Sequence, residues 1–180
     1  GFSIVTDSIY SNLNSSTVYY CIILDSNGCH DVVQINNIPE PDPISTTFNT
    51  VDQNGFDISC YGASDAIVTA HTTGGNAPYN YSIDDVYYSD DSTFNNISSG
   101  WLSLYIIDDN NCSGIDSVQV TEPNVLDPNI TILNPIACVG GNNGILASIP
   151  QGGVAPFSYT WSNGGNNDSI AGLNEGFYFV

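Results

Sequence analysis

The chain has 180 residues, of which 19 are Asp or Glu and none is Lys or Arg, so its formal net charge is −19. This composition excludes nucleic acid, phosphorylated ligands and anionic membrane surfaces as partners, because proteins bind them through Lys and Arg. It does not indicate disorder, since 41% of the residues are hydrophobic and the aromatic residues fall in periodic segments.

The predicted elements begin with a strand in the apolar stretch 18–24. Tyr19, Cys21 and Ile23 lie on its core face, where Cys21 is expected as a buried thiol. The stretch is far shorter than the roughly 20 residues that a membrane-spanning helix needs, so we expect no direct membrane insertion. We interpret residues 1–41 as the C-terminal part of a first β-sandwich repeat.

Residues 42–123 are predicted to form one complete β-sandwich repeat. Alternation with period two, bounded by Asn, Gly, Asp, Ser and Pro, places strands at 45–51, 56–60, 66–72, 78–84, 86–89, 93–97, 101–108 and 115–121. No segment keeps a helical period over three turns, so no helix is expected. Leu102, Leu104 and Ile106 lie on the core face of the strand 101–108, and Tyr178 and Val180 are their counterparts later in the chain. So many short strands in so few residues are typical of a β-sandwich.

Residues 124–180 are interpreted as the N-terminal part of a third repeat, because several motifs return. A Gly-Gly turn followed by Pro and an aromatic-polar-aromatic alternation occupies 74–82 and again 152–160, an offset of 78 residues. Cys-x-Gly at Cys60 and Cys138 keeps the same offset. An Asp- and Asn-rich turn ends in Cys29 and again in Cys112, an offset of 83 residues. The chain is therefore predicted to be all-β, with tandem repeats of about 80 residues divided at Glu-Pro linkers near 41 and 123.

The order of these motifs resembles a known family. Cys-x-Gly, Gly-Gly-x-x-Pro-Tyr-x-Tyr, Leu-x-x-Gly-x-Tyr at 173–178, Asp-x-Asn-Gly-Cys and Glu-Pro together are similar to the SprB-type repeat. That repeat occurs in giant gliding-motility adhesins, which are cell-surface proteins of the Bacteroidota. The resemblance implies immunoglobulin-like or PKD-like sandwiches, export by the type IX secretion route, and an extracellular role in surface attachment or gliding.

Our functional prediction is a non-enzymatic stalk or fibre segment of a very large secreted adhesin. One alternative is an array of carbohydrate-binding modules, which aromatic residues on a flat outer face would favour. Another is a set of spacer repeats in a secreted hydrolase. Catalysis within the chain itself is not expected, because His30 and His71 fall in different repeats and no Gly-x-Ser-x-Gly motif is present.

No cofactor is required by this interpretation, but the acidic turns suggest a calcium site. Asp108, Asp109 and Asn111 bring together carboxylate and amide oxygens, which are the ligands that calcium prefers. The same residue types are also the ones that tight hairpin turns demand for conformational reasons. Both interpretations stay open at this point.

Four of the five cysteines follow the repeat register, namely Cys29, Cys60, Cys112 and Cys138. Recurring positions in an exported protein favour disulfides, and Cys60 with Cys112 is the pair that falls within one repeat. In a standard sandwich these two positions would lie at opposite ends, so a bond between neighbouring repeats is the alternative, and both pairings stay open.

The outward face of the last long strand of each repeat is apolar, where a solvated face should be polar. Either neighbouring loops cover it, or it contacts another copy of the chain in a homo-oligomer or filament, or a surface glycan. The candidate contact residues are Tyr20, Trp101, Tyr105, Phe177 and Phe179. Neighbouring repeats of the same chain are expected as further partners.

Asp-Ser-x triplets form a last group of candidate sites. They look like the O-glycosylation acceptor that Bacteroidota use in exported proteins, and their serines are Ser8, Ser92, Ser117 and Ser169.

Overall fold

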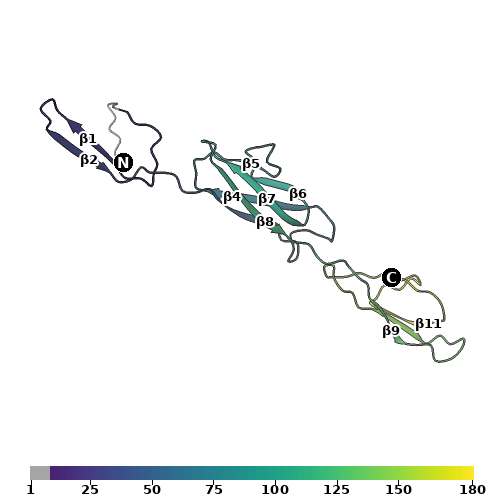
Figure 1. Cartoon of the computed structure of the whole chain (residues 1–180). Helices are drawn as coiled ribbons and strands as arrows, with labels where there is room; N and C mark the ends of the chain where they lie inside the picture. The colour runs from purple at the N-terminus through teal and green to yellow at the C-terminus, as the bar shows by residue number, and fades with distance from the viewer. Residues whose placement is uncertain (1–8) are drawn as a thin grey trace. The chain divides into compact units, whose positions relative to one another are not determined.

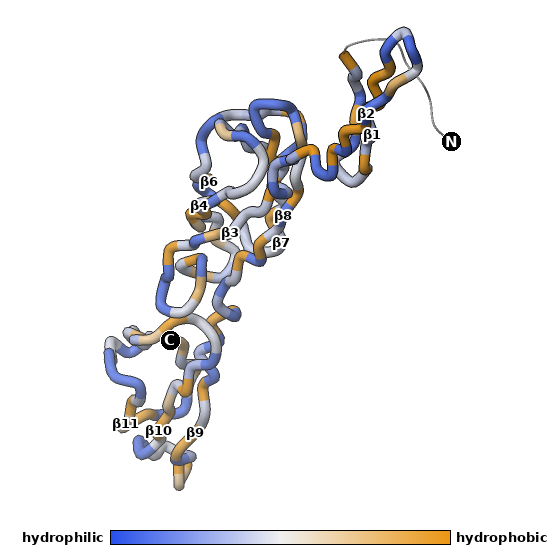
Figure 2. The backbone as a smooth tube through the Cα atoms, turned by 90° about the vertical axis from the view of Figure 1, so that its left-hand side faces the viewer, coloured by the Kyte–Doolittle hydropathy of each residue, from blue (hydrophilic) through white to orange (hydrophobic). Residues whose placement is uncertain are grey.

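The computed structural model describes residues 9–180, which contain strands and no helix (Figure 1). The chain forms two compact units, Gly1–Pro43 and Ile44–Val180. In Figure 2, hydrophobic and hydrophilic stretches alternate along the coloured part of the tube. The all-β prediction is confirmed, whereas the repeat length of about 80 residues and the boundaries near 41 and 123 stay predictions.

The first unit contains one antiparallel hairpin, made of β1 (Tyr19–Leu24) and β2 (His30–Ile35). Leu24 pairs with His30 across the turn. Cys21 is exposed, and Ile23 is 65% exposed, so the prediction that they face a core is wrong here. The reason is that β1 and β2 form a sheet of their own, and no buried cluster includes any described residue of this unit.

The second unit begins with two antiparallel sheets of three strands each. One has the order β3 (Ser45–Thr50), β4 (Ala66–Thr73), β6 (Thr93–Ile97), and the other has the order β5 (Asn80–Ser82), β7 (Gly100–Ile107), β8 (Ser113–Val120).

The core of this part lies between the two sheets. Both of its buried clusters combine residues from the two sheets, for example Val68 of β4 with Val120 of β8, and Ala70 of β4 with Leu104 of β7. Leu104 and Ile106 are almost fully buried, as their position on the core face predicts. Two sheets packed on a shared core make this a β-sandwich.

The strand predictions differ from the structure at three places. The segment 78–84 contracts to β5, and 86–89 retains only an isolated bridge between Tyr81 and Ser89. The segment 56–60 is not a strand, because the N–H groups of Asp57 and Ile58 both donate to the carbonyl oxygen of Thr121, at 3.1 and 3.2 Å. Two successive N–H groups on one carbonyl cannot continue as a ladder. Ile58 is nevertheless fully buried, which explains its apolar character.

Residues 124–180 form a third sheet, with the order β11 (Ser169–Leu173), β10 (Gly144–Ser148), β9 (Ile130–Asn134). Its core centres on Trp161, which is 2% exposed and whose Nε1 donates to the carbonyl oxygen of Asn167 at 2.9 Å. Tyr178 and Val180 pack against this cluster, as predicted for the core face. The second copy of the Gly-Gly-x-x-Pro motif continues as a loop and not as the expected strand.

We predict that Leu104→Ala lowers the free energy of unfolding of the sandwich by about 2–5 kcal/mol, because the substitution removes a fully buried side chain between two sheets. The matched control is Ile115→Ala on the neighbouring strand β8. Ile115 is 70% exposed, so its loss should cost less than about 0.5 kcal/mol. Urea unfolding followed by circular dichroism measures both values. Equal losses would contradict the position of the core.

Candidate functional site

The carboxylate of Asp108 joins two loops that are distant in sequence. Asp108 directly follows β7 and is only 2% exposed. Its Oδ1 accepts hydrogen bonds from the backbone N–H groups of Asn110 at 2.9 Å and Cys112 at 2.8 Å. Its Oδ2 accepts from the N–H group of Asn76 at 2.9 Å. One side chain therefore shapes the β7–β8 turn and fixes the Gly-Gly-x-x-Pro loop against it.

The neighbouring backbone reinforces this connection. The N–H group of Asp109 donates to the carbonyl oxygen of Asn76 at 3.0 Å. Gly75 has a φ of +57°, and a Cβ at this position would lie 2.9 Å from Oδ2 of Asp108. The second glycine of the motif is therefore required both by its backbone conformation and by the space that the carboxylate occupies.

Backbone donors also stabilise the charge of Asp108. The hydrogen bond from Asn76, with those from Cys112 and Asn110, holds the pKa of Asp108 below its ordinary value of 3.8. Asp25 forms the same turn in the first unit, where its Oδ1 accepts from the N–H groups of Asn27 and Cys29, both at 2.8 Å. The bond from Cys29 contributes most to a lowered pKa of Asp25. The acidic turn is thus the same local structure in both copies.

Other carboxylates bind the backbone in the same way. Asp84 Oδ1 accepts from the N–H groups of Val86 at 2.9 Å and Tyr87 at 3.0 Å. Glu122 Oε2 accepts from the N–H group of Gly62 at 2.7 Å. In a chain without Lys or Arg, backbone N–H groups supply the donors that ionised carboxylates need.

The predicted calcium ligands have a conformational role in this structure. All of the hydrogen bonds described for Asp108 come from the backbone, and Asn111 donates its N–H group to the carbonyl oxygen of Asp108 at 2.9 Å within the turn. Among residues 9–180 no group of three or more His, Cys, Asp or Glu side chains is placed to hold a metal ion. Calcium binding by Asp108, Asp109 and Asn111 stays a prediction, and the turn needs no metal to explain these residues.

The structure does not bring Cys60 and Cys112 together. Cys112 directly precedes β8, whereas Cys60 follows Ile58, which is bonded to Thr121 beyond the other end of β8. A strand of this length separates its ends by roughly 25 Å, and a disulfide needs Cα atoms within about 7 Å. The proposed bond within the repeat is therefore not formed, and all five cysteines in the described part of the chain are free and exposed.

The candidate contact residues are exposed to different degrees. Trp101 is 71% exposed and Tyr105 is half-buried on the outer face of the β5-β7-β8 sheet. Phe177 and Phe179 are largely exposed within residues 124–180, and Tyr20 is 54% exposed in the first unit. Trp101 and Tyr105 thus share one face, and the other three residues belong to other parts of the chain.

Sequence reasoning missed one aromatic residue near this face. The hydroxyl group of Tyr88 donates to Oδ1 of Asp85 at 2.6 Å. This hydrogen bond, with smaller contributions that include the nearby Tyr105, raises the pKa of Tyr88 to about 12. The Asp-x-x-Tyr spacing of a tight turn was the available signal.

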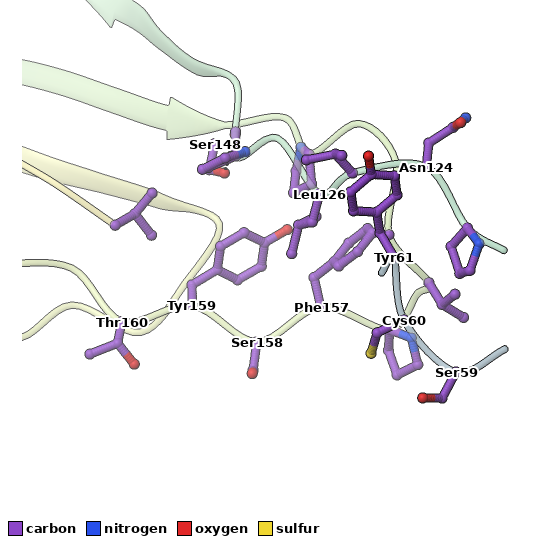
Figure 3. A pocket seen from close by; sticks show the side chains of 18 residues that line it. Ser59, Cys60, Tyr61, Asn124, Leu126, Ser148, Phe157, Ser158, Tyr159 and Thr160 are labelled. Carbon is purple, nitrogen blue, oxygen red and sulfur yellow. Dashed lines mark hydrogen bonds between the residues drawn. The ribbon is translucent and has the colours of Figure 1, made fainter. Parts of the chain in front are cut away.

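A groove with a volume of about 750 Å³ lies within the second unit (Figure 3). Figure 3 shows Tyr61 and Phe157 directed toward each other beside Leu126, with Tyr159 directed into the same space. Its lining contains no His, Asp or Glu among the residues described. The groove therefore lacks the imidazole and carboxylate groups that most often act as general acids and bases in enzymes.

The histidines and the candidate acceptor serines are separate features. His30 lies in β2, and His71 lies in β4, where its Nε2 is 3.2 Å from Nδ2 of Asn49. Ser117 is exposed on β8, whereas Ser92 and Ser169 are half-buried. Ser8 lies outside the described residues. Glycosylation at these serines stays a prediction.

These features define an all-β protein built from similar β-rich segments in tandem. The family model described as SprB repeat matches residues 56–86 and 130–166, and each match contains one Cys-x-Gly and one Gly-Gly-x-x-Pro motif. These two matches confirm the predicted resemblance to the SprB-type repeat and indicate an adhesin-like repeat region. No curated protein matched the chain. The described part of the chain contains no helix that is long and apolar enough to cross a membrane.

We predict that Asp108→Asn lowers the melting temperature at pH 7 by several degrees, because the amide N–H₂ group would replace one of the two acceptor oxygens and face a backbone N–H group. Since folding lowers the pKa of Asp108, its stabilising contribution is complete above 3.8 and is lost as the pH falls through the folded-state pKa. The difference between wild type and variant should therefore shrink below pH 4. Asp109→Asn, which changes an exposed neighbour, is the control. Identical pH profiles of melting temperature for wild type and Asp108→Asn would contradict this role.

Proposed function

We propose that the chain is a structural stalk or fibre segment of a very large adhesin, exported to the cell surface and used in attachment or gliding. The observation that carries the proposal is the tandem occurrence of two SprB repeats, since such repeats occur in cell-surface proteins. The type IX export route and the gliding role are part of the proposal. Lateral assembly into filaments stays a prediction.

The connection between the two matched repeats supports a stalk. Glu122 binds the N–H group of Gly62 in the Cys-x-Gly turn of the sandwich, and Pro123 is fully buried. One residue later, the carbonyl oxygen of Asn124 accepts from the N–H group of Gly153 at 2.8 Å, in the second Gly-Gly motif. The linker is thus hydrogen-bonded on both sides, which is the property of an ordered joint and not of a flexible tether.

The second glycine pair fits this joint closely. Gly152 has a φ of +68°, and a Cβ there would collide with the carbonyl oxygen of Val125. Both copies of the Gly-Gly motif therefore approach another backbone or side-chain group too closely for a larger residue, Gly75 at Asp108 and Gly152 at the linker.

The composition suits a protein exposed to proteases and salt. Trypsin cleaves after Lys and Arg, and the chain has neither. Its 19 carboxylates repel one another in dilute solution, and salt screens this repulsion. A stalk outside the cell would benefit from both properties.

We predict that Gly152→Ala loosens the joint, because the new Cβ would displace the linker backbone at Val125. The N–H group of Gly153, which donates to the carbonyl oxygen of Asn124, should then exchange its hydrogen several times faster than in the wild type, as measured by NMR. Gly140→Ala is the matched control, since Gly140 also has a positive φ, +73°, but no atom lies within 4 Å of the added Cβ. Equal exchange rates of the Gly153 N–H group in the two variants would contradict a role for the close approach of Gly152 to the linker.

We further predict that antibodies against the chain label intact cells of the source organism. Trypsin treatment of those cells should leave the segment uncut, because it offers no cleavage site, whereas proteinase K should remove the labelling. A matched culture with the gene deleted provides the background. Labelling that appears only after the cells are permeabilised would rule out the surface function.

A further inference from the structure

The outer face of the β5-β7-β8 sheet combines exposed rings with neutral polar groups. Side chains alternate along a strand, so Trp101, Ser103 and Tyr105 of β7 share this face. Their partners on β8 are Gln119, Ser117 and Ile115, in that order. We call these six residues the aromatic face. Trp101 and Ile115 are 71% and 70% exposed, so nothing in the second unit covers them.

The two rings of the aromatic face are spaced along one strand. Tyr105 lies four positions after Trp101, which corresponds to roughly 13 Å along the strand, and Ser103 lies between them. Of the nearby acidic groups, Asp85 already accepts a hydrogen bond from Tyr88 at 2.6 Å. The six side chains themselves carry no charge. An extended ligand could therefore contact both rings and find hydroxyl and amide groups between and beside them.

Charge selects among the ligands that could occupy this face. A second copy of the chain would bring another 19 carboxylates and no Lys or Arg to pair with them, and a polyanion would be repelled in the same way. A polycation would bind through carboxylates, and the aromatic face has none. An uncharged ligand is not repelled by the carboxylates of the chain and does not need them for binding.

Hydrogen bonding indicates which class of uncharged ligand fits the aromatic face. The aromatic face offers the hydroxyl groups of Ser103 and Ser117 and the amide group of Gln119, all of which both donate and accept hydrogen bonds. A complementary ligand should therefore carry uncharged groups that do the same. A neutral sugar meets this requirement through its hydroxyl groups, and its C–H faces stack on exposed aromatic rings.

We propose that the aromatic face binds a neutral glycan, with Trp101 and Tyr105 as stacking platforms and with Ser103, Ser117 and Gln119 as hydrogen-bonding groups. This goes beyond the stalk function, which requires no ligand. Phe177, the counterpart of Trp101 in the next repeat, is also fully exposed. Weak sites repeated along a chain add up to strong attachment through multivalency.

The two tryptophans of the chain provide a direct test. Trp101 is 71% exposed and Trp161 is 2% exposed, so acrylamide should quench the fluorescence of Trp101 almost alone. The probes for the full 180-residue chain are neutral hexasaccharides of glucose, xylose and mannose, a galacturonate hexamer as the anion, and a glucosamine hexamer as the cation. At least one neutral hexamer should protect Trp101 from quenching, and the galacturonate hexamer should not.

Variants locate the binding site. Tyr105→Ala should weaken binding of the neutral hexamer by roughly tenfold or more, while Tyr61→Ala, which alters an aromatic residue that is 60% exposed and lies off this face, should leave it unchanged. Circular dichroism confirms that each variant is folded.

Three outcomes would overturn the proposal. One is that none of the neutral hexamers protects Trp101. Another is that Trp101 becomes protected as the protein concentration rises, with no hexamer present, and that Tyr105→Ala abolishes this protection, which would identify a second copy as the occupant. The third is protection by the glucosamine hexamer alone that high salt abolishes, which would identify a cation. None of these results would affect the surface-labelling test of the stalk function.

Discussion

The hydrogen bond between Asp108 and the N–H group of Asn76 is the interaction on which the repeat depends. It spans 32 positions of sequence and joins the two motifs that recur along the chain, the acidic turn and the Gly-Gly-x-x-Pro loop. Because the carboxylate also accepts from Asn110 and Cys112, one side chain sets the shape of the turn and the position of the loop. Gly75 must be glycine to admit it. The two motifs therefore occur together because they are in contact.

The same principle explains how a chain with a net charge of −19 folds without a single Lys or Arg. Its carboxylates obtain their donors from backbone N–H groups in turns, as at Asp25, Asp84 and Glu122. These hydrogen bonds provide acceptors for backbone N–H groups in irregular segments. A sandwich with short strands contains many such segments. The outer faces are left with acceptors and aromatic rings, and this is the surface on which the proposed stalk would meet its surroundings.

Much of the sandwich could be predicted from alternation alone. Strand β6 was predicted at its observed bounds, and the buried positions of Leu104 and Ile106 followed from the alternation of β7. Residues 56–60 could not be assigned correctly, because Ile58 is buried through contacts with β8 and not through a ladder of its own. The predicted core face of β1 is exposed in the structure. Alternation within one strand shows which side chains share a face, but it does not show whether a second sheet packs on that face.

At the candidate site, the sequence indicated which residues are important but did not indicate which residues they contact. The acidic turn at Asp108 was recognised from Asp and Asn, but its contact with Asn76 is a property of the folded chain. The pairing of Cys60 with Cys112 was wrong because repeat register fixes positions along the sequence, and β8 separates the two thiols in space. The sequence identified Trp101 and Tyr105 as part of an apolar outward face, whereas the neutral polar residues beside them emerged only from the β7–β8 register.

Amide hydrogen exchange of Asn76, measured by NMR, tests the central interaction most directly. If Asp108 holds the loop, the Asn76 N–H group should exchange far more slowly than the amides of other loops. Its chemical shift should follow the protonation of Asp108 as the pH is lowered. Exchange at the rate of an unprotected loop amide, or a chemical shift that does not titrate with Asp108, would contradict the account.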